Sequence, residues 1–257
     1  WVDKPAAILE AYLGGEAIGE AEAKALYGDV NPSGRLAETF PKKLSDNPSY
    51  LYYFGEGDRV EYREGVFVGY RYYTAKEIAP LFPFGYGLSY TKFEYNDLTL
   101  DKSEIGDSES LKVSVKVKNV GNVAGKTAVQ LYVCPPRKEV IRPVRELKGF
   151  DKIELAPGEE KTVEFTLDPR AFAHWANLLH DWRIESGEYR IQICENADDV
   201  ILEAPVSVHS EKPLRPNSFT LGSTMNEFAM NTEGRAFIDR NIGHMIKGML
   251  KVGFIPG

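Results

Sequence analysis

Residues 110–119 read SLKVSVKVKN, a stretch that alternates apolar and polar side chains without interruption. Lysines and serines occupy one side of it, and four aliphatic residues occupy the other: Leu111, Val113, Val115 and Val117. Alternation with a period of two is typical of a strand that buries one face in an antiparallel sheet. The stretch therefore predicts an all-β region with its core on the aliphatic side.

Six further segments of the same kind surround this strand. They read FEYNDLTL at 93–100, TAVQLYVC at 127–134, LKGFDKIEL at 147–155, KTVEFTL at 161–167, GEYRIQIC at 187–194 and DVILEAPVSV at 199–208. Turn signals such as APGEE and ESGEY separate them. Seven short strands of this pattern predict a two-sheet Greek-key sandwich over residues 93–208. Because the Cys-Trp-Cys pattern of antibody domains is missing from the sequence, a fibronectin type III-like sandwich fits best.

Residues 1–60 have a different character. DKPAAILEAYLGG predicts a helix that begins at Asp3 and ends at Gly14, and EAIGEAEAKALYG predicts a second helix that ends at Gly28. The second helix would place Ile18, Ala21, Ala25 and Leu26 inward, and NPSG at 31–34 follows it as a turn. Two helices and a turn cannot bury a core, so we interpret residues 1–60 as the edge of a larger α/β domain.

Residues 61–92, called the strap below, are rich in Tyr, Phe, Gly and Pro and follow no clear period. A long irregular segment of this kind inside a compact chain is usually functional or docks one part on another. The aromatic residues can pack between two domains, or they can line a pocket for a sugar or an aromatic ligand. The packing interpretation is favoured, because aromatic clusters are more often core than ligand sites.

Residues 209–257 are predicted to form a linker and a helical tail. TMNE is a capping-box pattern in which Thr224 and Glu227 begin a helix. A second apolar stretch starts at Phe237 and continues through Ile242 and Met245. Such a tail can bind a groove or a membrane surface, although an apolar stripe with Met is more often core. The glycines within the tail argue against one long helix.

Composition excludes several classes of function. The formal net charge of −7 gives no basic footprint for nucleic acid, and no apolar run is long enough to cross a membrane. Cys134 and Cys194 do not form a disulfide framework, the His residues match no zinc spacing, and we expect no metal or cofactor. The chain opens at Trp1 without a signal pattern, which indicates a trimmed protein or a piece of a longer one. The thiols favour the cytoplasm, and secretion stays open.

The chain resembles the C-terminal portion of glycoside hydrolase family 3. The resemblance rests on AILEAYLGGEAIGEAEAKALYGDVNPSGRLAETFP, EGVFVGYRYY, LFPFGYGLSYTKFEY and the sandwich segments from VKNVGNVAGKTAVQLYV to RPVRELKGFDKIELAPGEEKTVEF, in the family's order. It covers about residues 1–205 and implies an α+β multidomain fold. In that fold the end of an α/β sandwich domain precedes a fibronectin type III-like sandwich and a short helical tail. The strap would lie at the junction.

The resemblance also implies what this chain does not carry. A retaining glycosidase needs a nucleophile and an acid/base carboxyl group. In the family these belong to a (β/α)8 barrel and to an upstream part of the α/β domain, and no position here matches either motif. Tyr62 and Glu64 are the candidates for lying near the sugar cleft. The carboxylates of GEGDRVEYREG, which are Glu56, Asp58, Glu61 and Glu64, are interpreted as a solvated loop.

Three hypotheses about function follow. The first is a part of a retaining β-glycosidase, with β-glucosidase as the favoured activity, that works with the barrel and the remaining α/β domain on the same or a second polypeptide. Its substrate would be a β-glucoside or a cello-oligosaccharide, and a homodimer stays open. The second is a stand-alone carbohydrate-binding or interaction module without catalysis. The third is an independent hydrolase that uses the Glu56–Glu64 loop. Linkage, aglycone, glucose against xylose, and whether the barrel precedes or follows stay open.

Overall fold

The computed structural model describes residues 2–215 and 222–241. The described residues fall into two compact units. The first contains the residues up to Ala173 together with Ile184–Ser210, and the second contains His174–Arg183 and the described residues after Ser210.

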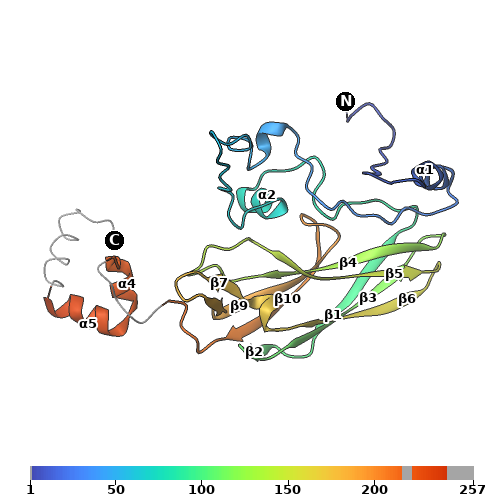
Figure 1. The fold of residues 1–257 in the computed structure, drawn as a ribbon. Coiled ribbons are helices and arrows are strands. Elements are labelled where there is room, and N and C mark those ends of the chain that lie inside the picture. The colour runs from blue at the N-terminus through green and yellow to red at the C-terminus, as the bar shows by residue number, and fades with distance from the viewer. Residues whose placement is uncertain (1, 216–221, 242–257) are drawn as a thin grey trace. The chain divides into compact units, whose positions relative to one another are not determined.

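The first unit contains the predicted sandwich, and all seven predicted strands form (Figure 1). One sheet has the order β1-β3-β6, made of Phe93–Leu100, Leu111–Asn119 and Glu160–Leu167. The other has the order β2-β10-β9-β4-β5, made of Glu104–Gly106, Val200–His209, Gly187–Cys194, Gly125–Cys134 and Glu146–Leu155. β2 was not predicted, and it pairs with β10 in parallel. A short helix, α3 (Pro169–Phe172), follows β6.

The core of the sandwich lies where the alternation predicts. The four aliphatic residues of β3 are at most 1% exposed, and they pack in one cluster with the inward side chains of β4 and β9. The members of this cluster that face them from those strands are Val129, Leu131, Val133, Tyr189, Ile191 and Ile193. Each fully buried aliphatic side chain of this size stabilises the fold by about 1.5–3 kcal/mol. The pattern of residues 110–119 therefore fixes the pairing register, because a one-residue slip would turn these side chains to solvent.

The N-terminal segment differs from the prediction. Only the second predicted helix forms, as α1 (Ile18–Tyr27), and it ends at Gly28 in the left-handed region with φ of 84°. The predicted helix from Asp3 to Gly14 is wrong, because none of those residues is in a helix. Leu13 is fully exposed, so nothing in the described structure covers an apolar helix face there. An isolated helix of that length is marginal without packing.

The predicted inward face of α1 is also largely uncovered. Ala21 and Leu26 are exposed, and Ile18 and Ala25 are only half-buried. Two further short helices follow, η1 (Leu44–Asp46) and α2 (Tyr70–Lys76). Figure 1 shows α2 and the chain around it beside β4. The fold class is thus the expected one: an all-β sandwich preceded by an incomplete α/β segment.

The second unit holds the hairpin of β7 (His174–Ala176) and β8 (Asp181–Arg183) and the helices α4 (Met225–Met230) and α5 (Thr232–Asn241). The predicted capping box is confirmed. The backbone N–H of Thr224 donates to the Glu227 carboxylate at 2.6 Å, and the N–H of Glu227 donates to Thr224 Oγ1 at 3.2 Å. The predicted helical residues from Ile242 onward lie outside the described residues.

Candidate functional site

The strap is bound to the outer face of the five-stranded sheet. Tyr70 of α2 stacks on Phe84 with ring centroids 5.1 Å apart, and it meets Tyr132 of β4 edge to face at 5.8 Å. The backbone N–H of Leu147 donates to the Tyr70 hydroxyl at 2.9 Å. Tyr132 and Cys194 are fully buried beneath these rings. Tyr70 and Phe84 of the strap therefore pack it against the sandwich.

A buried glutamine adds polar contacts to this packing. Gln130 of β4 is 4% exposed, and its Nε2 donates to the carbonyl oxygens of Gly85 at 3.0 Å and Glu195 at 2.7 Å. Its Oε1 accepts from the Tyr132 hydroxyl at 3.0 Å. A buried amide with all of these bonds fixes the position of the strap more narrowly than apolar contact alone.

The turn NPSGR forms a second attachment to the sandwich. Asn31 Nδ2 donates to the carbonyl oxygen of Ala124 at 3.0 Å, and its Oδ1 accepts from the Ser89 hydroxyl and the Tyr90 N–H. Arg35 donates to the carbonyl oxygen of Gly87 and, at 3.2 Å, to Thr127 Oγ1. The sequence predicted only a turn here, because hydrogen bonds to residues more than fifty positions away leave no local pattern.

The two residues predicted to lie near a sugar cleft are on an open loop. Tyr62 is 87% exposed, and Glu64 is half-buried with its carbonyl oxygen accepting from the Phe67 N–H at 3.0 Å. Within the same loop, Glu61 forms an ion pair with Arg63, whose guanidinium lies 4.4 Å from the centre of the Tyr52 ring. The other predicted loop carboxylates, Glu56 and Asp58, are exposed. The loop therefore exposes polar and aromatic side chains on the surface of the described chain.

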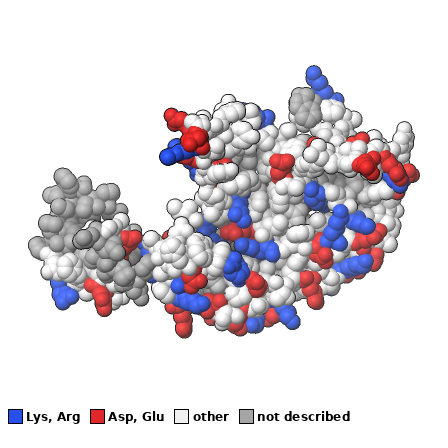
Figure 2. All heavy atoms as spheres, viewed as in Figure 1, with Lys and Arg blue, Asp and Glu red and all other residues white. Residues whose placement is uncertain are grey.

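The N-terminal segment also exposes many large apolar side chains. Figure 2 shows charged groups of both signs over the sandwich, whereas the N-terminal segment is mostly uncharged between two charged clusters. Many large apolar side chains before residue 69 are more than 40% exposed: Ile8, Leu9, Tyr12, Leu13, Leu26, Tyr27, Val30, Leu44, Tyr50, Leu51, Tyr53, Phe54, Val60, Tyr62, Val66 and Val68. So many exposed large apolar side chains in one segment are typical of a face that contacts another domain or protein.

Other chemistry is limited in the described residues. Across residues 2–215 and 222–241, no group of three or more His, Cys, Asp or Glu is placed to hold a metal ion. Within the same ranges, no helix combines the length and the apolar character that a membrane span needs. Cys134 and Cys194 are free and buried, and burial raises the pKa of Cys134 to about 11 and that of Cys194 to about 12. Both are therefore inert thiols rather than nucleophiles.

Two family models match the chain. The model described as the glycosyl hydrolase family 3 C-terminal domain matches residues 1–90, and the model described as a fibronectin type III-like domain matches residues 127–197. The class of protein is therefore a family 3 C-terminal domain joined to a fibronectin type III-like sandwich. The exposed face of residues 8–68 belongs to the first part, and the sheet that carries the strap belongs to the second.

Known proteins agree with this class. Thermostable beta-glucosidase B of Acetivibrio thermocellus is 56% identical over 93% of this chain and 31% of its own length. The probable beta-glucosidase I of Aspergillus clavatus is 47% identical over 78% of this chain and 25% of its own length. The crystal structure of the Bifidobacterium adolescentis GH3 beta-glucosidase superimposes on this chain with a TM-score of 0.79 and 38% sequence identity. The match covers 89% of this chain and 33% of that one.

A beta-glucosidase of Kluyveromyces marxianus in complex with glucose gives a TM-score of 0.76 at 40% identity, covering 81% of this chain and 25% of that one. The chain thus spans between a quarter and a third of the length of these relatives. It belongs to glycoside hydrolase family 3 and corresponds to the C-terminal portion of its members.

Proposed function

We propose that this chain is the C-terminal part of a retaining β-glucosidase that hydrolyses terminal β-D-glucosyl residues. Its role is to complete the α/β domain and to brace the domains that hold the catalytic carboxyl groups. The observation that carries this proposal is the combination of a firmly bound strap with an uncovered apolar face before residue 69. The names of the relatives, all of them beta-glucosidases, support the same activity.

The proposal includes the partners of this face. The barrel and the remaining α/β domain, on the same or a second polypeptide, would cover the exposed apolar side chains, since removing them from water stabilises the contact. Tyr62 and Glu64 would then lie at the edge of the sugar cleft, where the Tyr62 hydroxyl can donate and accept hydrogen bonds and the Glu64 carboxylate can accept them from sugar hydroxyls. The substrate would be a β-glucoside or a cello-oligosaccharide. Native mass spectrometry of the complete enzyme tests whether it forms a homodimer.

A chimeric enzyme tests the proposal. The matching third of the Acetivibrio thermocellus enzyme would be replaced by this chain, and hydrolysis of a chromogenic β-glucoside would be measured beside the parent and beside this chain alone. We expect the chimera to be active and the lone chain to be inactive. Activity in the lone chain would overturn the proposal, and so would a folded chimera, by circular dichroism and native mass, that lacks activity.

A second candidate, a carbohydrate-binding module without catalysis, is favoured by the exposed aromatic residues Tyr53, Phe54 and Tyr62. Affinity electrophoresis of the lone chain in gels that contain soluble β-glucan separates the two. Retardation by the glucan, together with an inactive chimera, would favour the module.

A further inference from the structure

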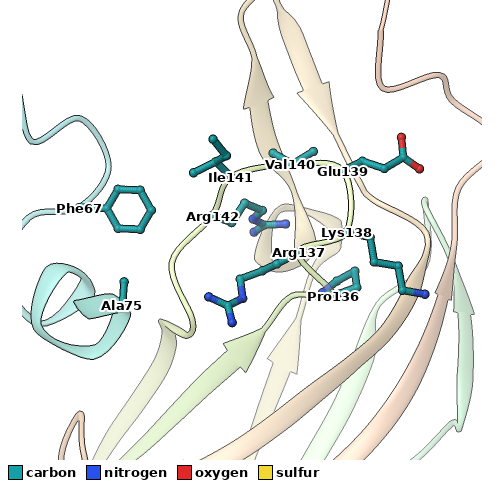
Figure 3. A pocket seen from close by; sticks show the side chains of 9 residues that line it. All are labelled: Phe67, Ala75, Pro136, Arg137, Lys138, Glu139, Val140, Ile141 and Arg142. Atoms are coloured by element: carbon teal, nitrogen blue, oxygen red, sulfur yellow. The ribbon is translucent and has the colours of Figure 1, made fainter. Parts of the chain in front are cut away.

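A cavity of about 470 Å³ lies between the strap and the loop that joins β4 to β5 (Figure 3). Phe67 and Ala75 of the strap form one wall, and residues 136–142 of the loop form the other. The volume is within the range of small-molecule sites in proteins. The two walls come from segments about sixty residues apart. Because strap residues form one of them, the cavity exists only when the strap is packed against the sandwich.

The loop wall is held from inside the sandwich at both ends. Glu185 is 1% exposed, and its Oε1 accepts from the backbone N–H groups of Lys138 and Glu139, each at 2.7 Å. At the other end Arg142 is 4% exposed and donates to the carbonyl oxygens of Phe172 at 2.8 Å and Ala173 at 3.2 Å. The residues between these anchors are therefore presented in a fixed conformation, as a preorganised site requires.

Arg137 directly precedes the first of these anchors and has an unfavourable backbone conformation. Its φ of 50° lies in the left-handed region, which is uncommon for a residue other than glycine. Figure 3 shows its guanidinium extending toward the side of Ala75, whereas the charged ends of Lys138 and Glu139 extend away from Phe67. Backbone strain of this kind costs about 1–3 kcal/mol and concentrates at functional sites.

Positive charge exceeds negative charge around this wall. The carboxylate of Glu146 lies 2.7 Å from Lys148 Nζ, 3.2 Å from the Arg142 guanidinium and 3.9 Å from that of Arg71. Arg71 is one helical turn from Ala75 on α2, so it belongs to the strap side. The side chains around the cavity thus include five cations, which are Arg71, Arg137, Lys138, Arg142 and Lys148, and three carboxylates, which are Glu139, Glu146 and Glu185.

We propose that this cavity binds a small organic anion, with its carboxylate or phosphate group on Arg137 and its apolar body between Phe67 and Ile141. The planar guanidinium matches both anionic groups in a bidentate geometry. Ile141 is 85% exposed, so a bound apolar ring would remove it from water. Both the strap and the loop contribute side chains to this site. The proposal does not depend on glycosidase activity.

Calorimetric titration of the full chain with three matched probes tests the proposal. The probes are benzoate, phenyl phosphate and neutral benzyl alcohol, which share one ring and differ in charge. We expect saturable binding of at least one anion, at least about tenfold tighter than benzyl alcohol, the difference expected for a charge-assisted hydrogen bond. The stronger anion identifies the preferred group, and equal or no binding of all three overturns the site.

Two variants of Arg137 locate the binding. Arg137→Gln removes the charge, and Arg137→Gly removes the charge while accepting the left-handed backbone without strain, so it preserves the fold. Both are expected to weaken anion binding about tenfold or more. Lys152→Gln, which makes the same charge change on exposed β5, is the control and should bind as the wild type. Unchanged affinity in the folded Arg137→Gly variant would overturn the assignment.

Discussion

The backbone N–H of Leu147 donates a 2.9 Å hydrogen bond to the hydroxyl of Tyr70, which lies 77 residues earlier in the chain. This bond joins the strap to the first residues of β5, at the place where the Tyr70 ring also contacts Phe84 and Tyr132. One side chain thus links the family 3 C-terminal domain to the sandwich through both polar and apolar contacts. The stability of the junction should depend strongly on it.

Two substitutions of Tyr70 separate these contacts. Tyr70→Phe removes only the hydrogen bond and should lower the free energy of unfolding by about 1 kcal/mol. Tyr70→Ala also removes the ring and should lower it by about 3–5 kcal/mol. Urea unfolding followed by tyrosine and tryptophan fluorescence measures both. Equal effects of the two variants would show that the ring contributes nothing to the junction.

Gly85 should not accept a side chain. Its φ is 81°, and a Cβ there would lie 2.3 Å from Oε1 of the buried Gln130. Gly85→Ala should therefore lower the free energy of unfolding by about 2 kcal/mol through backbone strain and overpacking. Gly57→Ala is the matched control, because its φ is 64° but no atom lies within 4 Å of the added carbon. A larger loss in the control than in Gly85→Ala would contradict this account.

Limited proteolysis of the lone chain should cut residues 1–60 before the sandwich. The N-terminal segment exposes its apolar side chains, whereas the strands of residues 93–208 bury theirs in one core. Segments with few buried contacts open locally at low free energy. Mass spectrometry of the products should find a surviving fragment that starts near residue 61. Equal protection of both regions would mean that residues 1–60 do not form an uncovered edge.

The two buried thiols should react slowly in the native state. Their pKa values of about 11 and about 12 lie above the ordinary value near 8.5, so little thiolate forms at pH 8. Because the folded-state pKa values are the higher ones, their contribution to stability is complete below about pH 8.5 and is lost as pH rises toward 11–12. Labelling with a thiol reagent at pH 8, with and without denaturant, measures this. Rapid labelling of the native chain would contradict the burial.

Glu146 should make stability fall at acid pH. Burial raises the pKa of its carboxyl group, but hydrogen bonds and charge from Lys148 and Arg142 outweigh this and hold it below the ordinary value. A lowered folded-state pKa adds stability above about pH 4.5, and that stability is lost as pH falls below it. Glu146→Gln should cost about 3 kcal/mol at pH 7 and less at pH 4, because the buried Arg142 guanidinium loses its carboxylate partner. Urea midpoints at the two pH values check the difference.

Alternation predicted seven of the eight strands in the two main sheets, all but the short β2, and it predicted none of the contacts that attach the strap. Val113 and Val115 are buried because a period of two leaves one face for the core, and any reading of residues 110–119 finds them. The helix predicted from Asp3 fails because its apolar face has no partner in the described chain. Helix propensity alone does not stabilise a helix of that length without packing.

The anchors were invisible for a different reason. Asn31 and Arg35 look like parts of a turn, and Glu185 looks like the start of another, yet each bonds to residues dozens of positions away. Long-range polar contacts follow from the tertiary fold and have no period along the chain. Tyr62 and Glu64, predicted from the family resemblance to lie near sugar, are found on an open loop, and that prediction stays open.

The outer face of the five-stranded sheet has a practical consequence for engineering. Tyr132 and Cys194 point away from the sandwich core and depend on the strap for cover. Transplanting residues 93–208 into another protein would expose these side chains to solvent, and the exposed apolar surface would promote self-association. An isolated sandwich should either retain residues 61–92 to cover this face or carry polar residues in place of the outward-facing apolar residues of β4 and β9.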